Sequence, residues 1–536
     1  MKRATEAMAS AAPPAQNGGD TAAAGAILDA PRFPVPNHSM LVFGTMLAAL
    51  MQVLDSTIAN VALPHMQSAL GAQPDTVTWV LTSYIIASAV ALPTTGWLSG
   101  RIGARRLFLL SVIGFVIASM LCGMARNLET MVLFRCLQGI SGAYILPLSQ
   151  SSMLDATKPS RHAPIMALWS LGVIIGPIIG PVLGGYLTEY SNWRWIFYVN
   201  VPLGIIALSM LIAQLPETPR VKRPFDWTGF LLVAVALAAL QMLLDRGHQV
   251  DWFHAAESWI YLGIIISCVW MAVIHFCTAA HPLFDRQLFG DLNYNIALVF
   301  MVVTGIVMYA NMALLPPLMQ GLLGYSVIDT GILLVPRSVG TLISMQAVGW
   351  LVRRGVDARI LVGTGTVLLA YSLHMMAGWS LAVDQYHIIV SGIIMGLGVG
   401  MIFLPVNVAA FTTLKPQLRA EGSSLLNLFR SVGSSIGISI MTALYARNIQ
   451  ISHADLSTHI SGNLGGVIDL STVDRYQSIA DAGLHMVDAE INRQAAMIAY
   501  IDDFYLMMWF SLATLPLILL MKIRPGPTFT PEDTGH

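Results

Sequence analysis

Charged residues are scarce in this sequence. Asp, Glu, Lys and Arg make up 11% of the 536 residues, whereas soluble globular proteins carry about 25%. A soluble chain of this length would fold as several domains, each with a charged, solvated surface, and too few charges are present for that. Because 55% of the residues are hydrophobic, we expect an all-α polytopic membrane protein. The net charge of −1 provides no basic surface for nucleic acid.

Cysteine is also rare, and no nucleotide-binding motif is present. Cys122, Cys136, Cys268 and Cys277 all fall inside apolar stretches, where we expect small buried side chains, and their spacing fits neither a disulfide framework nor a zinc site. The sequence has no phosphate-binding loop of the G-x-x-x-x-G-K-[ST] type. We therefore expect no enzyme activity, no metal and no cofactor, and an ion or cargo gradient rather than ATP as the energy source.

Fourteen segments have the length and hydrophobicity of a spanning helix, which needs about 20 mostly apolar residues. They cover residues 40–63, 77–97, 107–125, 128–153, 164–188, 195–215, 227–245, 257–277, 294–320, 327–351, 359–379, 384–412, 421–445 and 501–521. An even number of spans puts both ends of the chain on the same side. The first 38 residues lack the apolar core of a signal peptide, so we predict disordered cytoplasmic tails over 1–38 and 523–536.

The distribution of Lys and Arg indicates on which side of the membrane the two termini lie. With a cytoplasmic N-terminus, the tails and inner loops hold 19 of the 28 Lys and Arg residues, and the outer loops hold six. The remaining three, Arg135, Arg337 and Arg430, lie inside spanning segments. Because cytoplasmic loops are enriched in Lys and Arg, this bias supports fourteen spans with both termini in the cytoplasm.

Two pairs of local motifs repeat along the chain. Gly96-Trp97-Leu98 is repeated after 253 residues, and the Gly142 and Pro147 pair is repeated after 258. A six-helix half occupies only about 180 residues, so two helices must be inserted between the halves, and cargo is expected near the membrane midplane between them. We predict a major facilitator fold arranged 6 + 2 + 6. Its bundles cover 39–215 and 293–522, the inserted pair covers 216–292, and a long periplasmic loop covers 446–500.

The long loop contains many acidic residues, and its second half has helical spacing with apolar positions. Two interpretations stay open for it. It is either a solvated loop or a docking surface for an external partner.

Ionisable residues within spanning segments are costly and mark functional sites by default. Asp55 and Arg135 lie about 12 Å and about 11 Å from the outer ends of their helices, so an opposite-charge pair is plausible. Pairing favours the charged carboxylate and burial disfavours it, so such a group can load and release a proton. The alternative is a static ion pair that satisfies two buried charges.

Other polar residues of the spanning segments are candidates for the substrate cavity. Arg337 and Arg430 could bind an anionic group of the cargo or pair with backbone carbonyls. The full set of cavity candidates is Gln52, Asn60, Gln138, Tyr144, Asn311, Arg337, Asn407, Asn427 and Arg430.

The fifth predicted span carries glycine at every fourth position, which makes one smooth face that another helix can approach closely. Its neighbouring prolines favour a kink. We therefore interpret the segment as a gating motif, with simple helix packing as the alternative. The motif consists of Gly172, Gly176, Pro177, Gly180, Pro181, Gly184 and Gly185.

Several of these stretches resemble the major facilitator superfamily, and specifically its fourteen-helix drug:proton antiporters of the EmrB/QacA type. The similarity is carried by LDSTIANVALP at 54–64, LFRCLQG at 133–139, the glycine-rich stretch at 172–185 and NWRWIF at 192–197. It spans roughly residues 40–522 and is closest to the EmrB branch.

The resemblance implies export of amphipathic toxic compounds in exchange for protons across the bacterial inner membrane. It implies that Asp55 is the proton and cation site and that Arg135 tunes it. It further implies a periplasmic EmrA-like adaptor and an outer-membrane channel as partners. Lipid, protons and small hydrophobic or cationic substrates complete the expected partners.

The chain departs from the family pattern in its cytoplasmic loop motif. Gly100 and Arg353 stand where the family usually has a gating carboxylate in each half, so the cytoplasmic latch must be weaker here or use other partners. The rest of the first-half motif is present as Gly96, Arg101, Gly103, Arg105 and Arg106.

Two other functions remain open. The first is a narrow exporter of one metabolite, such as a siderophore or antibiotic. The second is a non-transporting membrane scaffold, which would tolerate apolar replacements at Asp55 and Arg135.

Overall fold

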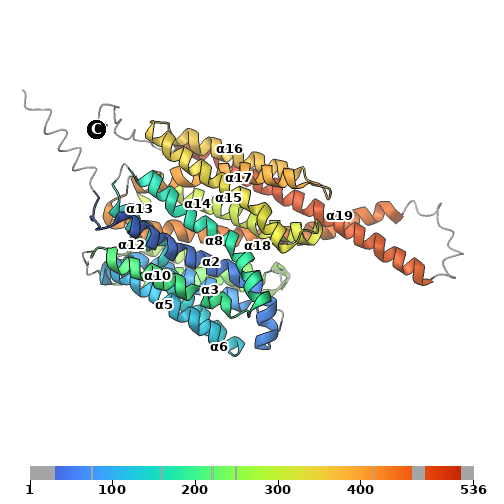
Figure 1. Ribbon diagram of the computed structural model, residues 1–536, viewed down its shortest axis with the longest axis horizontal. Helices are drawn as coiled ribbons and strands as arrows, with labels where there is room; N and C mark the ends of the chain where they lie inside the picture. The colour runs from blue at the N-terminus through green and yellow to red at the C-terminus, as the bar shows by residue number, and fades with distance from the viewer. Residues whose placement is uncertain are drawn as a thin grey trace, which may run out of the picture.

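The computed structural model describes residues 31–520, except 74–75, 159–160, 219, 221–222, 248–249, 251, 413 and 462–476. Throughout this part of the chain the regular secondary structure is helical, without a strand (Figure 1). The predicted tail over 523–536 and most of the predicted tail over 1–38 lie outside the described residues. The described end of that first tail contacts the bundle, since Phe33 N–H donates to the Asp155 carbonyl over 3.1 Å.

The first half of the chain forms α2 to α10. Its elements are α2 (His38–Leu70), α3 (Trp79–Ala91), η1 (Leu92–Thr94), α4 (Thr95–Ile102), α5 (Ala104–Met124), α6 (Leu128–Gly142), α7 (Ile145–Ala156), α8 (His162–Tyr190), α9 (Trp195–Tyr198) and α10 (Asn200–Gln214).

The rest of the chain forms the inserted helices and the second half. Its elements are α11 (Trp227–Arg246), η3 (Trp252–His254), α12 (Ala256–Thr278), α13 (Arg286–Phe289), α14 (Leu292–Pro317), η4 (Leu318–Leu322), α15 (Val327–Arg353), α16 (Ala358–Ala377), α17 (Gln385–Thr412), η5 (Pro416–Leu418), α18 (Arg419–Ser461), α19 (Gln477–Leu512) and α20 (Leu515–Leu520).

Twelve helices in the described part are long and apolar enough to cross a membrane. They correspond to twelve of the fourteen predicted spans. The other two predictions fall on α8 and α18, which run along the bundle but are not among the twelve (Figure 1). In α18 the serines, glycines, Asn427 and Arg430 lower the hydropathy. The described structure therefore supports an all-helical bundle, and the 6 + 2 + 6 arrangement stays a prediction.

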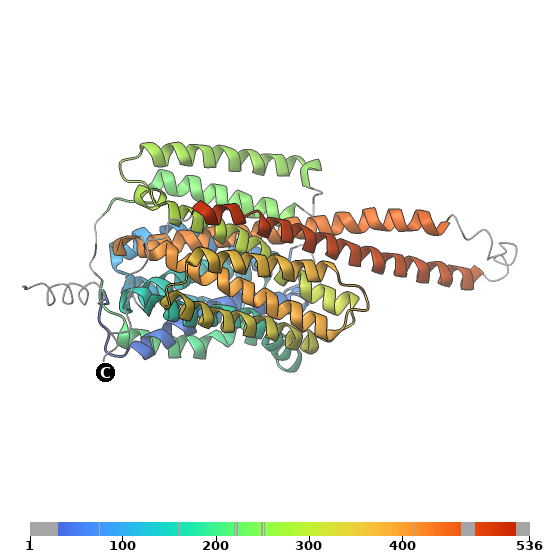
Figure 2. The same cartoon turned by 90° about the horizontal axis from the view of Figure 1, so that it is seen from above.

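The two ends of the bundle differ. We call the end where α2 and α18 begin the base, and the opposite end the hairpin end. At the hairpin end α18 and α19 project together beyond the other helices (Figures 1 and 2). With 43 and 36 residues they are about 64 Å and about 54 Å long, roughly twice the hydrocarbon core.

Three side-chain pairs join the projecting helices. The Tyr445 and Tyr500 rings lie 4.4 Å apart, Asn448 donates to Asp502 over 3.3 Å, and His453 lies 3.0 Å from Asp488. Most of the predicted loop over 446–500 is thus helical, because α18 and α19 continue past the other helices and pack against each other. Residues 462–476 of that loop lie outside the described part.

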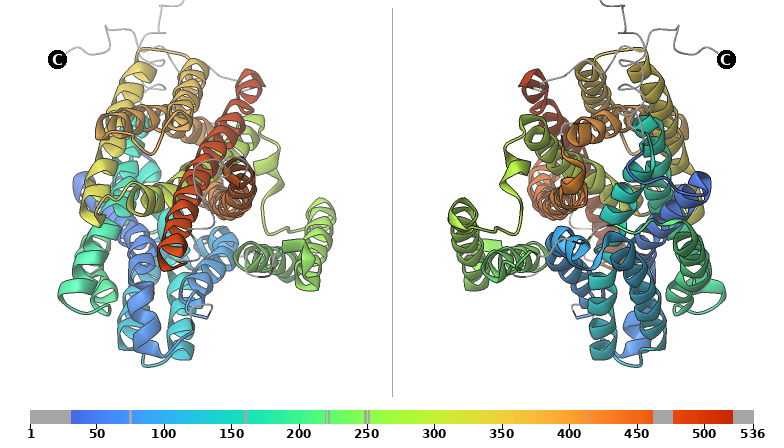
Figure 3. Two further views of the ribbon diagram at one scale, coloured as in Figure 1. Left: turned by 90° about the vertical axis from the view of Figure 1, so that its right-hand side faces the viewer. Right: turned by 90° about the vertical axis from the view of Figure 1, so that its left-hand side faces the viewer.

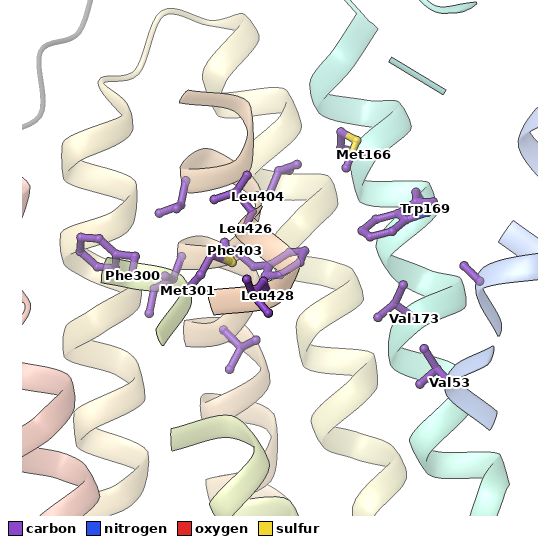
Figure 4. Packing of buried hydrophobic residues seen from close by; sticks show 14 of the residues in the cluster. Val53, Met166, Trp169, Val173, Phe300, Met301, Phe403, Leu404, Leu426 and Leu428 are labelled. Atoms are coloured by element: carbon purple, nitrogen blue, oxygen red, sulfur yellow. The ribbon is translucent and has the colours of Figure 1, made fainter. Parts of the chain in front are cut away.

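The larger of two buried apolar clusters in the described part draws its side chains from both halves of the chain. Met166, Trp169 and Val173 follow one face of α8, and Phe300 and Phe403 come from α14 and α17 (Figure 4). The inserted pair lies at the side of this body (Figure 3), where α11 packs against both α3 and α18. It therefore covers part of the seam between the two halves.

The prediction that all four cysteines are buried is wrong. Cys122 is buried, Cys136 and Cys268 are half-buried, and Cys277 is exposed. Cys268 and Cys277 lie on α12. Only 6% of the most apolar 18-residue stretch of this helix is buried, so its apolar side chains are suited to face lipid.

Helix α8 packs its glycine face against α2. A Cβ atom at Gly176 would lie 2.9 Å from the Val53 side chain and 3.1 Å from the backbone nitrogen of Leu54. At Gly180 it would lie 2.2 Å from the Thr57 hydroxyl. The close approach fixes the turn of α2 that carries Asp55, next to Leu54.

We predict that Gly176→Val destabilises the protein by about 1–3 kcal/mol, the usual cost of overpacking a close contact. The matched control is Gly185→Val, because a Cβ atom at Gly185 meets nothing within 4 Å. The measurement is the thermal unfolding midpoint of the detergent-solubilised protein. Equal midpoints for the two variants would contradict a tight contact between α8 and α2.

Candidate functional site

The structure brings Asp55 of α2 and Arg135 of α6 together in the first half. Arg135 Nη1 donates to Asp55 Oδ2 over 2.8 Å, and the two side chains are 0% and 1% exposed. Taking two charges out of water is expensive, and a buried pair is tolerated only when further hydrogen bonds satisfy both groups. Whether this ion pair is stable therefore depends on the hydrogen bonds that its neighbours supply.

Two amides complete the coordination of the Asp55 carboxylate. Gln138 Nε2 donates to Oδ1 over 2.8 Å, and Asn200 Nδ2 donates to the same oxygen over 2.7 Å. Asn200 also donates to the Ser119 hydroxyl over 2.9 Å. Both carboxylate oxygens are thus satisfied by donors from α6 and α10, which stabilises the ionised form.

The Arg135 guanidinium is held on several sides. Its Nε donates to the Val80 carbonyl over 2.9 Å, and Nη1 also donates to Gln138 Oε1 over 2.8 Å. The centre of the guanidinium lies 4.6 Å from the Tyr84 ring and 5.6 Å from the Phe197 ring. A lysine cannot make these contacts, because its ammonium lacks the planar fork and the flat face.

Sequence reasoning missed Asn200. The available signal was one amide in the otherwise apolar run FYVNVPLG, where a fully buried polar side chain must find partners. Its partners come from α2 and α5, far away in sequence, so the sequence alone does not identify them.

The cavity candidates fall into separate groups. Gln138 belongs to the Asp55 site, Gln52 is buried on α2, and Asn60 is exposed. The Tyr144 hydroxyl lies 3.0 Å from Thr94.

The candidates of the second half form two clusters around arginines. Arg337 Nη1 donates to Asn311 over 2.9 Å, and Arg430 Nη2 donates to Asn427 over 2.7 Å. Among the described residues, neither arginine forms an ion pair with a carboxylate. Arg337 also donates to the Met308 carbonyl over 3.4 Å, and the Arg430 guanidinium lies 6.0 Å from the Phe403 ring, so both cationic groups have neutral partners.

Polar side chains join the two halves near the base. Gln150 of α7 donates to Asn407 of α17 over 3.0 Å and accepts from Ser423 of α18 over 2.5 Å. Ser424 donates to the Leu92 carbonyl over 2.5 Å. Since α7 and η1 belong to the first half and α17 and α18 to the second, these bonds hold the halves together.

An ion pair reinforces the same contact. Arg419 at the start of α18 lies 2.8 Å from Asp155 near the end of α7, and Arg32 approaches Asp155 to 3.6 Å. Both Asp155 and Arg419 are largely buried. We call the Asp155–Arg419 ion pair the base latch.

The segments flanking the inserted helices cross the base beside this latch. Trp97 Nε1 donates to the Arg223 carbonyl over 2.9 Å, and the Arg223 guanidinium lies 4.0 Å from the buried Glu421. The backbone N–H of Asp285 donates to Glu421, and Lys415 donates to Gln287 over 2.7 Å. These contacts connect Trp97 of the first half with Glu421 of the second.

The loop motif of the first half lies at the same place. Gly96 packs against Glu421, where a Cβ atom would come within 2.8 Å of the side chain. Gly103 joins α4 to α5 with a φ of 96°, which favours glycine. Arg105 lies 3.9 Å from the exposed Glu217.

The remaining motif residues take no part in the contact. Arg101 and Arg106 are exposed, and Gly100 is half-buried. The side chains of Arg353, Pro177 and Pro181 lie outside the described part.

We predict that Asn200→Ala destabilises the protein by about 1–3 kcal/mol, because Asp55 and Ser119 each lose a buried hydrogen-bond donor. Ser209→Ala on the same helix is the control, since this exposed hydroxyl only bonds the Ile206 carbonyl of its own helix. Chemical or thermal unfolding of the purified protein measures both. A cost for Asn200→Ala no larger than that of the control would show that Asn200 does not support the pair.

Comparisons with known proteins show the family of this chain. Residues 45–438 match the model of the Major Facilitator Superfamily. The fatty acid resistance protein FarB of Neisseria gonorrhoeae is 33% identical over 91% of this chain and 96% of its own length. The multidrug export protein EmrB of Escherichia coli is 32% identical over 77% and 81%.

A solved structure supports the fold. The human organic anion transporter MFSD10 (TETRAN) superposes with a TM-score of 0.56 at 15% identity, covering 89% of this chain and all of that one. The chain therefore belongs to the major facilitator superfamily of multi-pass membrane transporters, which are not enzymes, and within it to the EmrB type of drug:proton antiporters.

Proposed function

We propose that this protein exports amphipathic toxic compounds across the bacterial inner membrane in exchange for protons, by alternating access. The observation that carries the proposal is the buried Asp55–Arg135 pair at 2.8 Å. Relatives named a multidrug export protein and a probable multidrug resistance protein support the cargo class. A scaffold would have no need for the desolvation cost of that pair.

The pair supplies a physical route to coupling. In the closed site three donors form hydrogen bonds to the Asp55 carboxyl oxygens. These donors come from α6 and α10, so a shift of either helix relative to α2 removes hydrogen bonds from a carboxylate that is already desolvated. The balance then moves toward the protonated form. Proton uptake thereby follows the conformation of the first half.

The conformation of the protein fits one stage of this cycle. The distribution of Lys and Arg supports a cytoplasmic base and two cytoplasmic termini. In that orientation, the base latch and the Gln150 bonds close the cytoplasmic side. We assign the structure to the state closed toward the cytoplasm. Fourteen spans in a 6 + 2 + 6 arrangement require α8 and α18 to cross the membrane with the twelve apolar helices.

The contacts at the base can hold the cytoplasmic side closed although the usual loop carboxylates are replaced by Gly100 and Arg353. Glu421 stands against Gly96 of the first half, close to where Gly100 replaces the usual acid. Arg223 and Asp285, which flank the inserted helices, bind it from the other side. The inserted pair therefore takes part in closing the cytoplasmic side.

We predict that Arg419→Gln opens the base. To detect opening, the four native cysteines are replaced by alanine and Ser423→Cys introduces a single reporter thiol. Ser423 is buried between the two halves, so the thiol reacts with a labelling reagent only when the base opens. Loss of the latch is expected to raise its labelling rate about tenfold, the factor that corresponds to 1.4 kcal/mol of closure free energy. Arg493→Gln is the control, because its ion pair with Glu490 is exposed on α19. Unchanged labelling in Arg419→Gln would refute the latch.

The direct test of function is dye transport in proteoliposomes with an acidic lumen and the base facing outward. We expect the wild type to accumulate a cationic dye and Asp55→Asn not to, because an amide cannot exchange a proton. Expression and thermal midpoint must match for the two proteins. If the wild type moves no dye, the hypothesis of a polyspecific pump is wrong. The narrow exporter of one metabolite and the non-transporting scaffold then remain.

A second cargo class has its own support. Arg337 and Arg430 lack a carboxylate partner in the described part, and FarB is named for fatty acid resistance. Amphipathic anions are therefore candidate cargo beside cations. A narrow exporter of one such metabolite is the alternative function. Competition by structurally unrelated compounds in the dye assay distinguishes them, because these compounds inhibit dye transport by a polyspecific pump and not by a narrow exporter.

The projecting helices suit a partner outside the membrane. About half of α18 and α19 extends beyond the hydrocarbon core, and exposed polar residues cover much of them. We propose that this hairpin docks an EmrA-like periplasmic adaptor, which would connect the transporter to an outer-membrane channel.

A further inference from the structure

Asp503 on α19 is a buried carboxyl group that has no hydrogen-bond partner among the described residues. Its residue is 1% exposed, yet neither side-chain oxygen has a hydrogen bond within the described structure. The contrast with Asp55 is sharp, since Asp55 accepts from three donors. The site already described does not use Asp503.

The helices around Asp503 provide packing rather than charge. α19 packs against α14, α16 and α18. Next to Asp503, the Phe504 ring lies 5.9 Å from Trp379, which follows α16. The Tyr505 ring lies 6.1 Å from His374 of α16.

The titratable side chains around this turn are few. Among the described residues they are Tyr500, Asp502 and Tyr505 on α19, Tyr445 of α18 against Tyr500, and His374 of α16 against Tyr505, while η4 has none. No Lys, Arg or His of the described part forms an ion pair with Asp503. The only other carboxyl group in the set, Asp502, adds repulsion rather than compensation.

An ionised carboxylate is not stable in such a place. Burying a charge without donors or a counter-ion costs far more than burying a neutral polar group, so the group takes up a proton instead. Asp502 provides the comparison on the same helix turn. It is exposed and accepts from Asn448 over 3.3 Å, so it has water and a donor for its charge.

The position of Asp503 tells which side supplies the proton. α19 enters the bundle from the hairpin end, and Asp503 lies near that end, beside the residues that follow α16. In the proposed antiport, protons enter the protein from this side. The exposed Asp502 and the paired Tyr445 and Tyr500 lie between Asp503 and the projecting helices.

We propose that Asp503 is a second proton-binding site of the transporter, separate from the Asp55–Arg135 pair and loaded from the hairpin end. Its role in the cycle rests on the proposed proton antiport, whereas its protonation in the present conformation does not. The ligand is a proton from water, which converts the buried carboxylate into a neutral carboxylic acid.

The test is infrared spectroscopy of the full-length protein in lipid at neutral pH. A protonated carboxylic acid has a C=O stretching band that a carboxylate lacks. We expect the wild type minus Asp503→Asn difference spectrum to contain this band, and the matched Asp502→Asn difference to lack it. A spectrum of Asp503→Asn with the full band of the wild type would overturn the proposal.

Two further measurements complete the design. If Asp503→Asn does not fold, Asp503→Glu replaces it, and a shifted carboxylic acid band is then the supporting result and an unshifted one the opposing result. For the role in transport, the rate of dye uptake is measured against pH. A changed pH profile in Asp503→Asn with an unchanged profile in Asp502→Asn supports the second site.

The two proposals fail in different ways. A lost band with an unchanged pH profile would overturn the transport role of Asp503 and leave Asp55 coupling intact. Dye transport without any proton dependence in the wild type would overturn the antiport itself, while the infrared result would still report the protonation of Asp503.

Discussion

The rest of the structure depends on the ion pair between Asp55 and Arg135. Both groups are completely removed from solvent, so the surrounding helices must supply what water would. α6 provides Gln138, α10 provides Asn200, and α8 keeps α2 in place through its glycine face. A membrane helix bearing an acid at this depth is stable only while these neighbours stay in position. Stability and conformational coupling therefore have the same structural origin.

The second constraint comes from the proposed alternating access, in which the two halves separate and close again. At the base, closure is made by polar contacts that water can replace, including the base latch and the Gln150 bonds. An apolar seal of the same size would be harder to open, because separating it exposes hydrophobic surface to water. The segments around Arg223 and Asp285 add a cross-connection, so the inserted helices are a working part of the closed state.

Much of the fold could be predicted from sequence, and the reasons are physical. Long apolar segments have no alternative to helix in a bilayer, and Asp55, Arg135 and Gln138 are conspicuous because polar groups are costly there. Asn200 and Glu421 were missed because their importance lies in partners more than a hundred residues away. The projecting parts of α18 and α19 were predicted as a loop, because the residues at 446–500 are mostly polar. These parts are helical because the two helices pack against each other.

The central claim is that cargo and proton movements are linked through Asp55. The most direct measurement loads proteoliposomes with a cationic dye, dilutes them into dye-free buffer of the same pH with the membrane potential clamped, and follows the lumenal pH. As the dye leaves, the account predicts acidification of the lumen by the wild type and none by Asp55→Asn. Protein-dependent dye efflux from the wild type at constant lumenal pH would contradict it.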